Sequence, residues 1–459
     1  MSATGGTIIR DQQNKRFGEI VTDSAKVKKG SVFIALKGER FDGHRFAGEA
    51  ARRGAACVIV HQDVRRSVMR DAMVVRVPDT LRALGDLAHF RRHKLAPKVL
   101  AITGSNGKTT TKEMTAAILE RASIAGQSLR GKVLKTHGNF NNLVGLPLTL
   151  LRLHKHHQVA VVELGTNRPG EIRRLCEIAD PDMGIITSVA AAHLEGLDSL
   201  AGVAREKGAL FRSMRADGAI AVNLEDPWVR RLGERFKGRK ITYGQGGQVR
   251  IESPRLAAGR GMRFTLCIGR MRSEVRLNFV GRHNLDNAAG AAALAHGFGA
   301  RLPAIRRGLE SAKPFPMRMQ VRSWHGIGII NDAYNANPAS MVAAVKTLAE
   351  IKCAGKKIAV LGDMFELGKK SPSQHLKLGS EIAKAGIDGL YLLGAQAHHV
   401  RRGAIRGGLR AEQIVIGADH GDLARRLRER VRKGDWLLFK GSRGMKMETV
   451  LKQLQGGSA

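Results

Sequence analysis

Val99-Leu-Ala-Ile-Thr-Gly-Ser-Asn-Gly-Lys-Thr-Thr-Thr-Lys-Glu113 is the stretch that decides the fold of this 459-residue chain. The apolar run from Val99 to Ile102 predicts a buried strand, and apolar positions recur at helical spacing after Lys108. Gly104 and Gly107 let backbone N–H groups approach an anion, and the start of the helix adds its partial positive charge. The stretch therefore predicts a loop that binds the phosphates of a nucleoside triphosphate.

The loop departs from the general pattern G-x-x-x-x-G-K-[ST] at one position, where Ile102 stands in place of a glycine. In such loops the lysine, here Lys108, reaches the outer phosphates, and the hydroxyl of the next residue, here Thr109, ligates Mg²⁺. The alternative is a glycine-rich turn beside a solvated lysine, but a strand directly before and a helix directly after favour the nucleotide loop. The residues expected at ATP in this loop are Gly104, Ser105, Asn106, Gly107, Lys108, Thr109 and Thr110.

The net charge is the unusual feature of the composition. With 77 Lys and Arg against 40 Asp and Glu, the chain carries +37, which attracts polyanions. The basic residues are spread along the whole chain, however, and the few aromatic residues (4%) do not interleave with them as in a base-stacking platform. We interpret the charge as a solvated surface that also attracts acidic small substrates, with no specific nucleic-acid partner.

The cysteines and the apolar runs indicate the compartment. Cys57, Cys176, Cys267 and Cys353 lie far apart without C-x-x-C spacing, which favours buried thiols in a reducing compartment over a zinc site. The first ten residues contain no apolar core of a signal peptide, and no apolar run reaches the roughly eighteen residues of a membrane span. We therefore expect a cytoplasmic chain without membrane insertion.

Strands that alternate with helices predict an α/β fold, and the length of the chain, too great for one core, predicts two to four domains. Turn-rich boundaries at Ala96-Pro97 and Lys313–Pro316 divide it into residues 1–96, 97–312 and 313–459. The middle segment adds an antiparallel annex around 248–280. The expected strands are 32–36, 57–60 and 73–77, then 99–103, 159–164, 184–187 and 219–223, then 328–331, 358–361, 390–394, 414–416 and 436–440. The expected helices include 46–53, 284–296, 338–351 and 374–385.

Polar residues near the ends of these strands are candidates for chemistry, since α/β sheets place their sites there. Glu163 ends an apolar strand, where it either faces solvent or, beside a phosphate loop, ligates Mg²⁺. His193 follows a strand, and by residue pattern alone it is a hydrogen-bonded loop histidine or a metal ligand. Lys207 alone resembles a surface lysine of a helix.

Two asparagine-rich stretches open helices. Asn284 is a good N-cap, and Asn287 either reads an adenine edge or supports that cap. Asp332 follows a strand, as does the residue that holds a ribose in dinucleotide folds. Asn337 with Pro338 is, by itself, only the start of a helix.

Taken in order, these motifs resemble the Mur ligase family from about Ile20 to Leu451. Thr103-Gly-Ser-Asn-Gly-Lys-Thr-Thr110 is similar to the ATP loop of the family, which is itself one glycine short of the general pattern. Within the family, the chain resembles the branch that joins D-alanyl-D-alanine to UDP-N-acetylmuramoyl-tripeptide, and it lacks the Asp-Asn-Pro-Arg stretch typical of a neighbouring branch. The stretches that carry this closer likeness are 38–44, 138–142, 145–151 and 332–338.

The resemblance implies a small α/β UDP-binding domain, a central P-loop ATPase domain with a parallel sheet, and a Rossmann-like C-terminal domain that brings the dipeptide. It implies a ligase that forms a peptide bond through an acyl phosphate, with ATP hydrolysed to ADP and phosphate, and that makes the UDP-muramoyl-pentapeptide precursor of peptidoglycan. We expect a monomer. The alternatives are another amide ligase of this fold, such as one similar to folylpolyglutamate synthetase, a basic P-loop NTPase that acts on nucleic acid, and a non-enzymatic binding protein.

The resemblance also implies roles for individual residues. Thr109 and Glu163 would hold one Mg²⁺, and Glu163, His193 and a carbamylated Lys207 would surround a second. These three residues and Lys108 would be the catalytic set. Asn287 would contact adenine, Arg318 a phosphate and Asp332 the ribose.

The remaining implied contacts are with the two other substrates. Position 25 is Ala25, where the family usually has arginine. The residues expected at the UDP substrate are Thr22, Asp23, Ser24, His44, Asn139, Asn141 and Asn142. Those expected at the dipeptide are Asn335, Asn337, Lys440 and Arg443.

Overall fold

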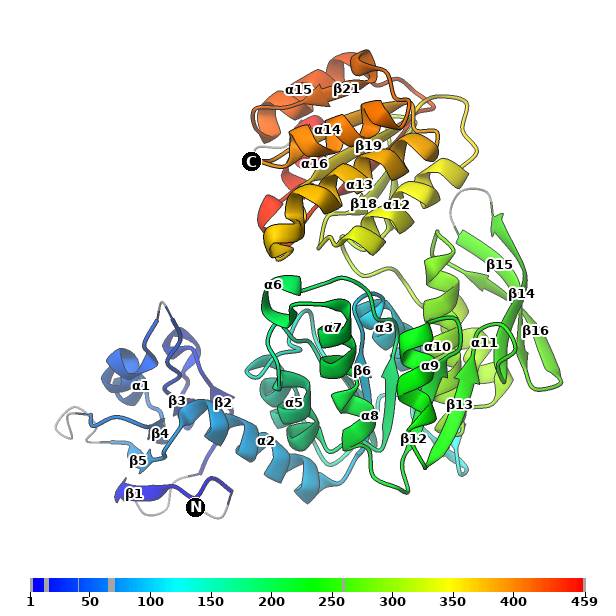
Figure 1. Cartoon of the computed structure of the whole chain (residues 1–459). Coiled ribbons are helices and arrows are strands. Elements are labelled where there is room, and N and C mark those ends of the chain that lie inside the picture. Colours follow the sequence, from blue (N-terminus) through cyan, green and yellow to red (C-terminus); the bar gives the residue numbers. More distant parts are fainter. Residues whose placement is uncertain (1–2, 12–15, 40, 65–70, 258–260, 457–459) are drawn as a thin grey trace. The chain divides into compact units, whose positions relative to one another are not determined.

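The computed structural model describes residues 3–11, 16–39, 41–64, 71–257 and 261–456 (Figure 1). The chain divides into two compact units. The first comprises residues 1–101, 131–165 and 171–182, and the second comprises residues 102–130, 166–170 and 183–459. The predicted boundaries at 96/97 and 312/313 divide the chain differently and stay a prediction.

The first unit begins with a five-stranded sheet in the order β1-β5-β4-β3-β2, in which only β1 is antiparallel to its neighbour. Alternate side chains of its strands enter two different apolar clusters, one with Phe33 and Val58 and the other with Ile34 and Ile59. Both faces are therefore covered. The strands are β1 Thr7–Arg10, β2 Ile20–Val21, β3 Val32–Ile34, β4 Cys57–Val60 and β5 Met73–Arg76, and the helices are α1 Ala47–Arg52 and α2 Thr80–Leu95.

Helix α2 leads from this sheet to the strand before the phosphate loop. It begins at the N-cap Asp79 and ends where Ala96 adopts left-handed backbone (φ 49°) before Pro97. The buried Arg92 donates hydrogen bonds to Ala179 O (3.1 Å) and to Asp182 Oδ2 (3.1 Å), and the same carboxylate oxygen accepts from the backbone N–H of Val99 (2.8 Å). These bonds fix the start of β6 (Lys98–Thr103).

The largest sheet has nine strands in the order β16-β15-β14-β13-β12-β11-β6-β10-β9. The β10–β9 pair and the run from β11 to β14 are parallel, whereas β14, β15 and β16 pair antiparallel, which confirms the annex predicted around 248–280. Beyond β6, the strands are β9 Val133–Lys135, β10 Val159–Glu163, β11 Met183–Ile186, β12 Ala219–Asn223, β13 Arg239–Tyr243, β14 Val249–Ala257, β15 Gly261–Ile268 and β16 Met271–Leu277. A separate hairpin pairs β7 Ser123–Ile124 with β8 Gln127–Ser128.

In the second unit, the helix that follows the phosphate loop, α3, packs against α10 and α11. Alanine and glycine dominate the buried positions of α10, which lets the helices approach closely. At Gly308 of α11, an added Cβ would lie 2.3 Å from Ile118 Cα of α3. The helices of this unit from α3 to α11 are α3 Lys108–Leu119, α6 Leu194–Leu197, α7 Leu200–Lys207, α8 Ala209–Ser213, α9 Pro227–Glu234, α10 His283–Gly297 and α11 Leu302–Ser311. The helices α4 Gly145–Leu151 and α5 Glu171–Ala179 belong to the first unit.

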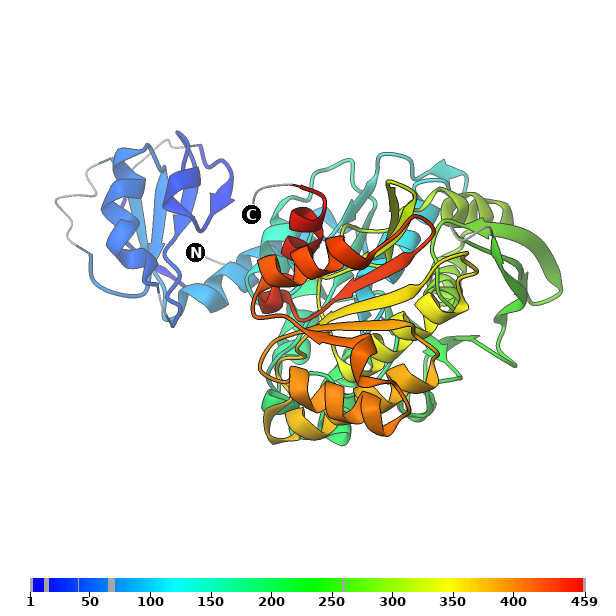
Figure 2. The ribbon, with the colours of Figure 1, turned by 90° about the horizontal axis from the view of Figure 1, so that it is seen from above.

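The last sheet of the second unit has the order β17-β18-β22-β19-β20-β21, and only β17 is antiparallel. Helices cover both faces (Figure 2). Phe439 of β22 lies in a cluster with Leu427 of α15 and Leu454 of α16, whereas its buried neighbour Leu438 points to the opposite face. The elements are β17 Gln320–Trp324, β18 Ile327–Asp332, β19 Lys357–Gly362, β20 Gly389–Leu393, β21 Ile414–Ile416, β22 Trp436–Lys440, α12 Pro338–Glu350, α13 Ser371–Lys384, α14 Ala397–Arg406, α15 His420–Arg430 and α16 Glu448–Leu454.

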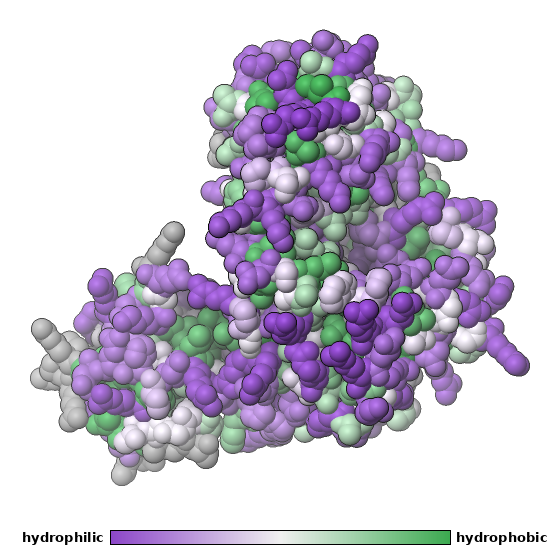
Figure 3. Space-filling view, in the orientation of Figure 1, coloured by the Kyte–Doolittle hydropathy of each residue, from purple (hydrophilic) through white to green (hydrophobic). Residues whose placement is uncertain are grey.

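The surface agrees with the charged composition. Hydrophilic residues cover most of the face drawn in Figure 3, with apolar residues scattered between them. Across the part of the chain that the structure describes, every helix is too short or too polar to span a bilayer.

Candidate functional site

The predicted phosphate loop is a tight turn between β6 and α3. Gly104 (φ 147°) and Gly107 (φ 81°) both adopt backbone that favours glycine. A Cβ at Gly104 would lie 1.9 Å from Thr187 Oγ1, and a Cβ at Gly107 would lie 2.0 Å from Asn287 Oδ1. At these two glycines the surroundings therefore leave room for backbone only, which is the arrangement that lets N–H groups reach a phosphate.

Several hydrogen bonds fix the shape of this loop. The Thr187 hydroxyl donates to Asn106 O (2.5 Å), the Ser105 N–H donates to Ser188 O (2.8 Å), and the Ser105 hydroxyl donates to Ala190 O (2.9 Å). Lys108 Nζ donates to Gly104 O (2.7 Å), which keeps this cation within the curve of the loop. The loop is thus ordered by the segment that follows β11.

Asn287 supports the loop from α10. Its Oδ1 accepts from the Thr111 hydroxyl (3.4 Å), and its Nδ2 donates to Asn284 Oδ1 (3.0 Å). Asn284 in turn donates to Val280 O (2.8 Å). The residue predicted to contact adenine is therefore buried against Gly107, with both ends of its amide turned to protein.

Lys207 is a buried amine at the end of α7. It is 1% exposed, and burial lowers the pKa of its ammonium well below the ordinary value, with Lys108 adding to the shift. Glu206, also buried, accepts from the N–H of Gly170 (2.7 Å) and from the Thr166 hydroxyl (3.3 Å). The buried surroundings thus favour the neutral, nucleophilic amine of Lys207 over its ammonium form.

His193 forms a close pair with a residue that the sequence analysis missed. Its Nδ1 lies 2.5 Å from Glu366 Oε2, and this bond lowers the pKa of the Glu366 carboxyl. Glu366 follows β19 in the stretch Gly362-Asp-Met-Phe-Glu-Leu-Gly368. A carboxylate after a predicted strand, the signal that drew attention to Glu163 and Asp332, was also present here.

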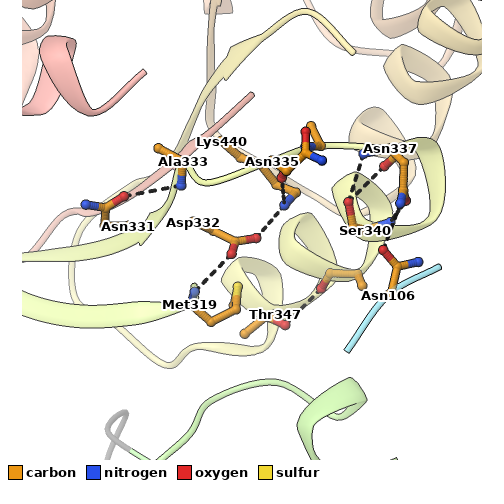
Figure 4. Close-up of polar contacts among 12 residues, drawn as sticks. Asn106, Met319, Asn331, Asp332, Ala333, Asn335, Asn337, Ser340, Thr347 and Lys440 are labelled. Carbon is orange, nitrogen blue, oxygen red and sulfur yellow. Dashed lines mark hydrogen bonds and ion pairs between the residues drawn. The ribbon is translucent and has the colours of Figure 1, made fainter. Parts of the chain in front are cut away.

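Asp332, the last residue of β18, has partners on both carboxylate oxygens (Figure 4). Oδ1 accepts from the Met319 N–H (3.0 Å), and Oδ2 lies 2.6 Å from Lys440 Nζ. Lys440 is 2% exposed and also donates to Asn335 O (2.9 Å). The structure therefore brings Asp332, Asn335 and Lys440 together as one buried ionic cluster.

Asn337 and Arg318 lie close in the sequence to the Asp332 and Asn335 part of this cluster. Asn337 is the N-cap of α12, and its Nδ2 donates to Asn106 Oδ1 of the phosphate loop at 2.8 Å. The guanidinium of Arg318 lies 4.1 Å from the ring centre of Tyr334, and its buried Nε has no hydrogen-bond partner among the described residues. Arg443 pairs with Glu448 at 2.6 Å.

Three family models match the chain in order. They are the Mur ligase family catalytic domain at residues 16–92, the Mur ligase middle domain at 102–295 and the Mur ligase glutamate ligase domain at 317–443. The UDP-N-acetylmuramoyl-tripeptide--D-alanyl-D-alanine ligase of Escherichia coli (strain K12) is 38% identical over 95% of this chain and 93% of the relative. The chain belongs to the Mur ligase family.

Further members of the Mur ligase family support this assignment. The ligase of the same name from Bacillus subtilis (strain 168) is 35% identical over 95% of this chain and 92% of its own length. A crystal structure of MurF from Acinetobacter baumannii superposes with a TM-score of 0.91 at 34% identity, covering 99% of this chain and 97% of that one. MurF from Thermotoga maritima, solved with ADP, gives a TM-score of 0.85 at 30% identity, with 98% and 99% covered. The three-domain α/β fold expected from the motifs is therefore confirmed.

In the first unit of this Mur ligase, Glu163 is buried at the end of β10 (1% exposed). Its Oε1 accepts from Asn141 Nδ2 (2.8 Å), and its backbone N–H donates to Thr136 Oγ1 (2.9 Å). Asn142 instead accepts a hydrogen bond from the N–H of Gly145, the first residue of α4 (2.8 Å). Asn141, predicted to contact the UDP substrate, is thus hydrogen-bonded to Glu163, predicted to bind Mg²⁺.

The predicted UDP-binding residues lie in two turns of the first unit. Asp23 accepts from the Ala25 N–H (3.0 Å), and Thr22, Ser24 and the exposed Asn139 lie at or near the surface. Both ring nitrogens of His44 have protein partners, because Nδ1 lies 2.7 Å from Asp42 Oδ1 and Nε2 accepts from the His61 N–H (3.2 Å). His44 therefore holds its own loop in shape.

Proposed function

We propose that this chain joins D-alanyl-D-alanine to UDP-N-acetylmuramoyl-tripeptide and hydrolyses ATP to ADP and phosphate. The observation that carries the proposal is the phosphate loop whose Gly104 and Gly107 leave no room for a Cβ, in a chain aligned over 95% of its length with ligases of this name. The reaction makes the pentapeptide precursor of peptidoglycan. We place it in the cytoplasm, since both ATP and UDP-linked precursors are cytoplasmic metabolites.

The chemistry needs an activated carboxylate, because a free carboxylate is a poor acyl donor at neutral pH. The terminal carboxylate of the tripeptide attacks the γ-phosphorus of ATP, and ADP leaves. The amine of D-alanyl-D-alanine then attacks the acyl phosphate, and inorganic phosphate leaves as the peptide bond forms. Lys108, held at the loop by Gly104 O, offsets the negative charge that builds up during phosphoryl transfer.

The proposed magnesium ligands are oxygen donors with one imidazole. Thr109, 2% exposed at the start of α3, and Glu163 would hold one Mg²⁺, and Glu163, His193 and carbamylated Lys207 a second. When bound, Mg²⁺ neutralises phosphate charge and orients the transferred group. Within the described residues no three His, Cys, Asp or Glu side chains cluster as a ready-made metal site, so the carbamate would supply an oxyanion that the unmodified chain lacks.

Carbamylation of Lys207 fits its surroundings. The neutral amine attacks CO₂, a C–N bond forms and one proton is released, which converts a cation into an anionic oxygen ligand. A buried amine whose pKa is lowered by desolvation has the free lone pair that this step requires. The lowered pKa therefore supports the modification.

We assign some of the predicted site residues to contacts with ATP or the dipeptide, and others to holding those residues in place. Arg318, whose guanidinium lies over the Tyr334 ring and whose buried Nε has no partner among the described residues, is suited to a phosphate, and Asp332 is suited to the ribose. We assign Asn287 to the adenine side of the site, through its position under Gly107. We retain Asn335 and Arg443 as candidates for contact with the dipeptide. We assign Asn337 to holding the phosphate loop through Asn106, and Lys440 to holding Asp332.

The test incubates the chain with ATP, Mg²⁺, UDP-N-acetylmuramoyl-tripeptide and D-alanyl-D-alanine, and measures phosphate release and the mass of the product. Phosphate release that depends on the dipeptide, with a product heavier by the dipeptide less water, is expected. Lys108→Ala is the inactive control. Release that is independent of the dipeptide, or that is stimulated instead by a folate with glutamate or by DNA, would contradict the proposal.

A further inference from the structure

His193 and Glu366 lie on two loops that meet within the second unit. His193 is the N-cap of α6 in the segment after β11, and Glu366 lies between β19 and the 3₁₀ turn Gly368–Lys370. The pair is separated by 173 positions in the sequence. Tertiary structure alone brings the two residues together.

Glu366 is bound to the other loop at two points. Its carboxylate lies 2.5 Å from His193 Nδ1, and its backbone carbonyl accepts from the N–H of Glu195 (3.2 Å). The glycine two residues on, Gly368, also lies close, since a Cβ there would be 3.9 Å from Glu195 Cα. The contact therefore fixes both the position of the Glu366 backbone and the direction of its side chain.

Both residues of the pair have left-handed backbone, at φ 54° for His193 and φ 61° for Glu366. Such backbone is unfavourable for residues other than glycine and is concentrated at functional sites. An incidental ion pair between surface side chains needs no such backbone on either side. The geometry thus shows two loops held in unfavourable conformations that place one imidazole against one carboxylate.

The loop that carries Glu366 is anchored to its own sheet. The Met364 N–H donates to Nε2 of the buried His375 (2.9 Å), and the Phe365 N–H donates to the hydroxyl of the buried Ser442 (2.8 Å). Asp363 accepts from the Gln396 N–H (3.2 Å). Glu366 is therefore presented from a rigid support rather than from a free loop.

We propose that Glu366 is a positioning residue that orients His193 for Mg²⁺ and so makes the metal site depend on the docking of the loop between β19 and the 3₁₀ turn Gly368–Lys370. The carboxylate accepts a hydrogen bond from the Nδ1–H of the neutral imidazole, which leaves the Nε2 lone pair available for a metal. Outer carboxylates of this kind fix the tautomer and direction of ligating histidines. The inference rests on the proposed function and adds to it a residue outside the expected ligand set.

The opposing interpretation is a surface ion pair of little consequence, since the Glu366 side chain is 49% exposed. The test compares Glu366→Ala and Glu366→Gln with Glu412→Gln, an exposed glutamate of the same sheet region that lies in the 3₁₀ turn before β21. Mn²⁺ binding in the presence of ADP is measured by EPR, and Mg²⁺ activation of ligation is measured alongside. The Mn²⁺ measurement needs neither the UDP substrate nor the dipeptide.

Glu366→Ala is expected to weaken Mn²⁺ binding and raise the Mg²⁺ concentration for half-activation by about 10- to 100-fold. Glu366→Gln is expected to give a smaller loss, because its amide oxygen still accepts from Nδ1. In a His193→Asn background, Glu366→Ala should cause no further loss of Mn²⁺ affinity. Glu412→Gln should match the unmodified chain in both measurements.

Unchanged Mn²⁺ affinity in both Glu366 variants overturns the inference, as does an activity loss with unchanged metal dependence. An unmodified chain that binds no Mn²⁺ with ADP overturns it as well. If thermal unfolding shows that Glu366→Ala is not folded, the Mn²⁺ affinities of Glu366→Gln and of Glu366→Gln combined with His193→Asn test the inference instead. A chain that forms no dipeptide product while Glu366→Ala still weakens Mn²⁺ binding contradicts the proposed function alone.

Discussion

Asn106 Oδ1 accepts a hydrogen bond of 2.8 Å from Asn337 Nδ2, across 231 positions of sequence (Figure 4). The same Asn337 amide accepts the Ser340 N–H through Oδ1 (2.9 Å), and the Ser340 hydroxyl completes the capping box. The amide that starts α12 therefore also binds the phosphate loop. The beginning of one helix is thus part of the support for the start of another, α3.

Asn337→Ala should lower the free energy of unfolding by about 1 kcal/mol through loss of the cap and should also raise the KM for ATP several-fold. Ser340→Ala removes the reciprocal bond of the capping box and leaves the bond to Asn106 in place, so its KM for ATP should stay unchanged. Urea unfolding and steady-state kinetics measure the two effects. Equal KM values in the two variants would contradict the role of the Asn106 bond.

Gly107→Ala should abolish tight ATP binding, because the new Cβ would lie 2.0 Å from Asn287 Oδ1 at a φ of 81°. Gly126→Ala is the matched control, since Gly126 has the same backbone (φ 80°) with nothing within 4 Å of an added Cβ. Both variants carry the strain of left-handed alanine, and only the first carries the collision. Calorimetric titration with ATP should show a loss at Gly107 and ordinary affinity at Gly126.

Lys207→Ala should abolish ligation, with partial rescue by a short carboxylate, whereas the exposed Lys377→Ala should be active. Carbamate formation needs the neutral amine, whose fraction rises with pH through the pKa. Because the pKa of Lys207 is lowered, carbamate should be present near pH 7, where an ordinary lysine is only about 0.04% neutral, and should fall as pH falls.

Labelling with ¹³C-bicarbonate and carbon NMR would detect this carbamate directly. A carbamate signal in the unmodified chain that is absent from Lys207→Ala is expected. Full ligation by Lys207→Ala would remove the residue from the metal site.

Asp332→Asn should lower the free energy of unfolding by about 3 kcal/mol, because it leaves the buried Lys440 ammonium without its carboxylate. Lys440→Met in the same chain should recover part of that loss. Urea unfolding of the two single variants and the double variant gives the coupling energy. Additive losses would show that the 2.6 Å pair contributes nothing beyond its separate groups.

Most buried strands were predictable because each corresponds to a run of consecutive apolar residues. The strand expected at 99–103 is Lys98–Thr103, and the strands expected at 57–60, 219–223 and 436–440 have those bounds in the structure. Fully buried parallel strands read as continuous apolar runs, so their positions follow from composition.

The strands that the sequence analysis missed have no such run. β13 begins with two exposed basic residues, and β17, at the edge of its sheet, has no fully buried residue. β9 is three residues long. Each becomes a strand because a neighbour supplies backbone partners, which local pattern does not report.

The candidate site shows the same division. The glycine loop and Lys108 are contiguous and were identified from spacing alone. The partners of His193, Asn337 and Lys440 lie far away in the sequence, so residue type suggested ligand contacts but could not report these contacts with protein. Such long-range pairs form through tertiary packing, so the spacing of residues in the sequence does not indicate them.

Helix α10, with its buried alanines and glycines, connects the core of the second unit to Asn287 under the loop. Along most of this helix, any larger side chain would push on α3 or on the sheet, and through Asn287 on Gly107. Inherited variation should therefore be rare along α10 and frequent on the charged exterior. Substitutions on the surface that change the net charge of +37 should therefore be tolerated more readily than larger side chains in α10.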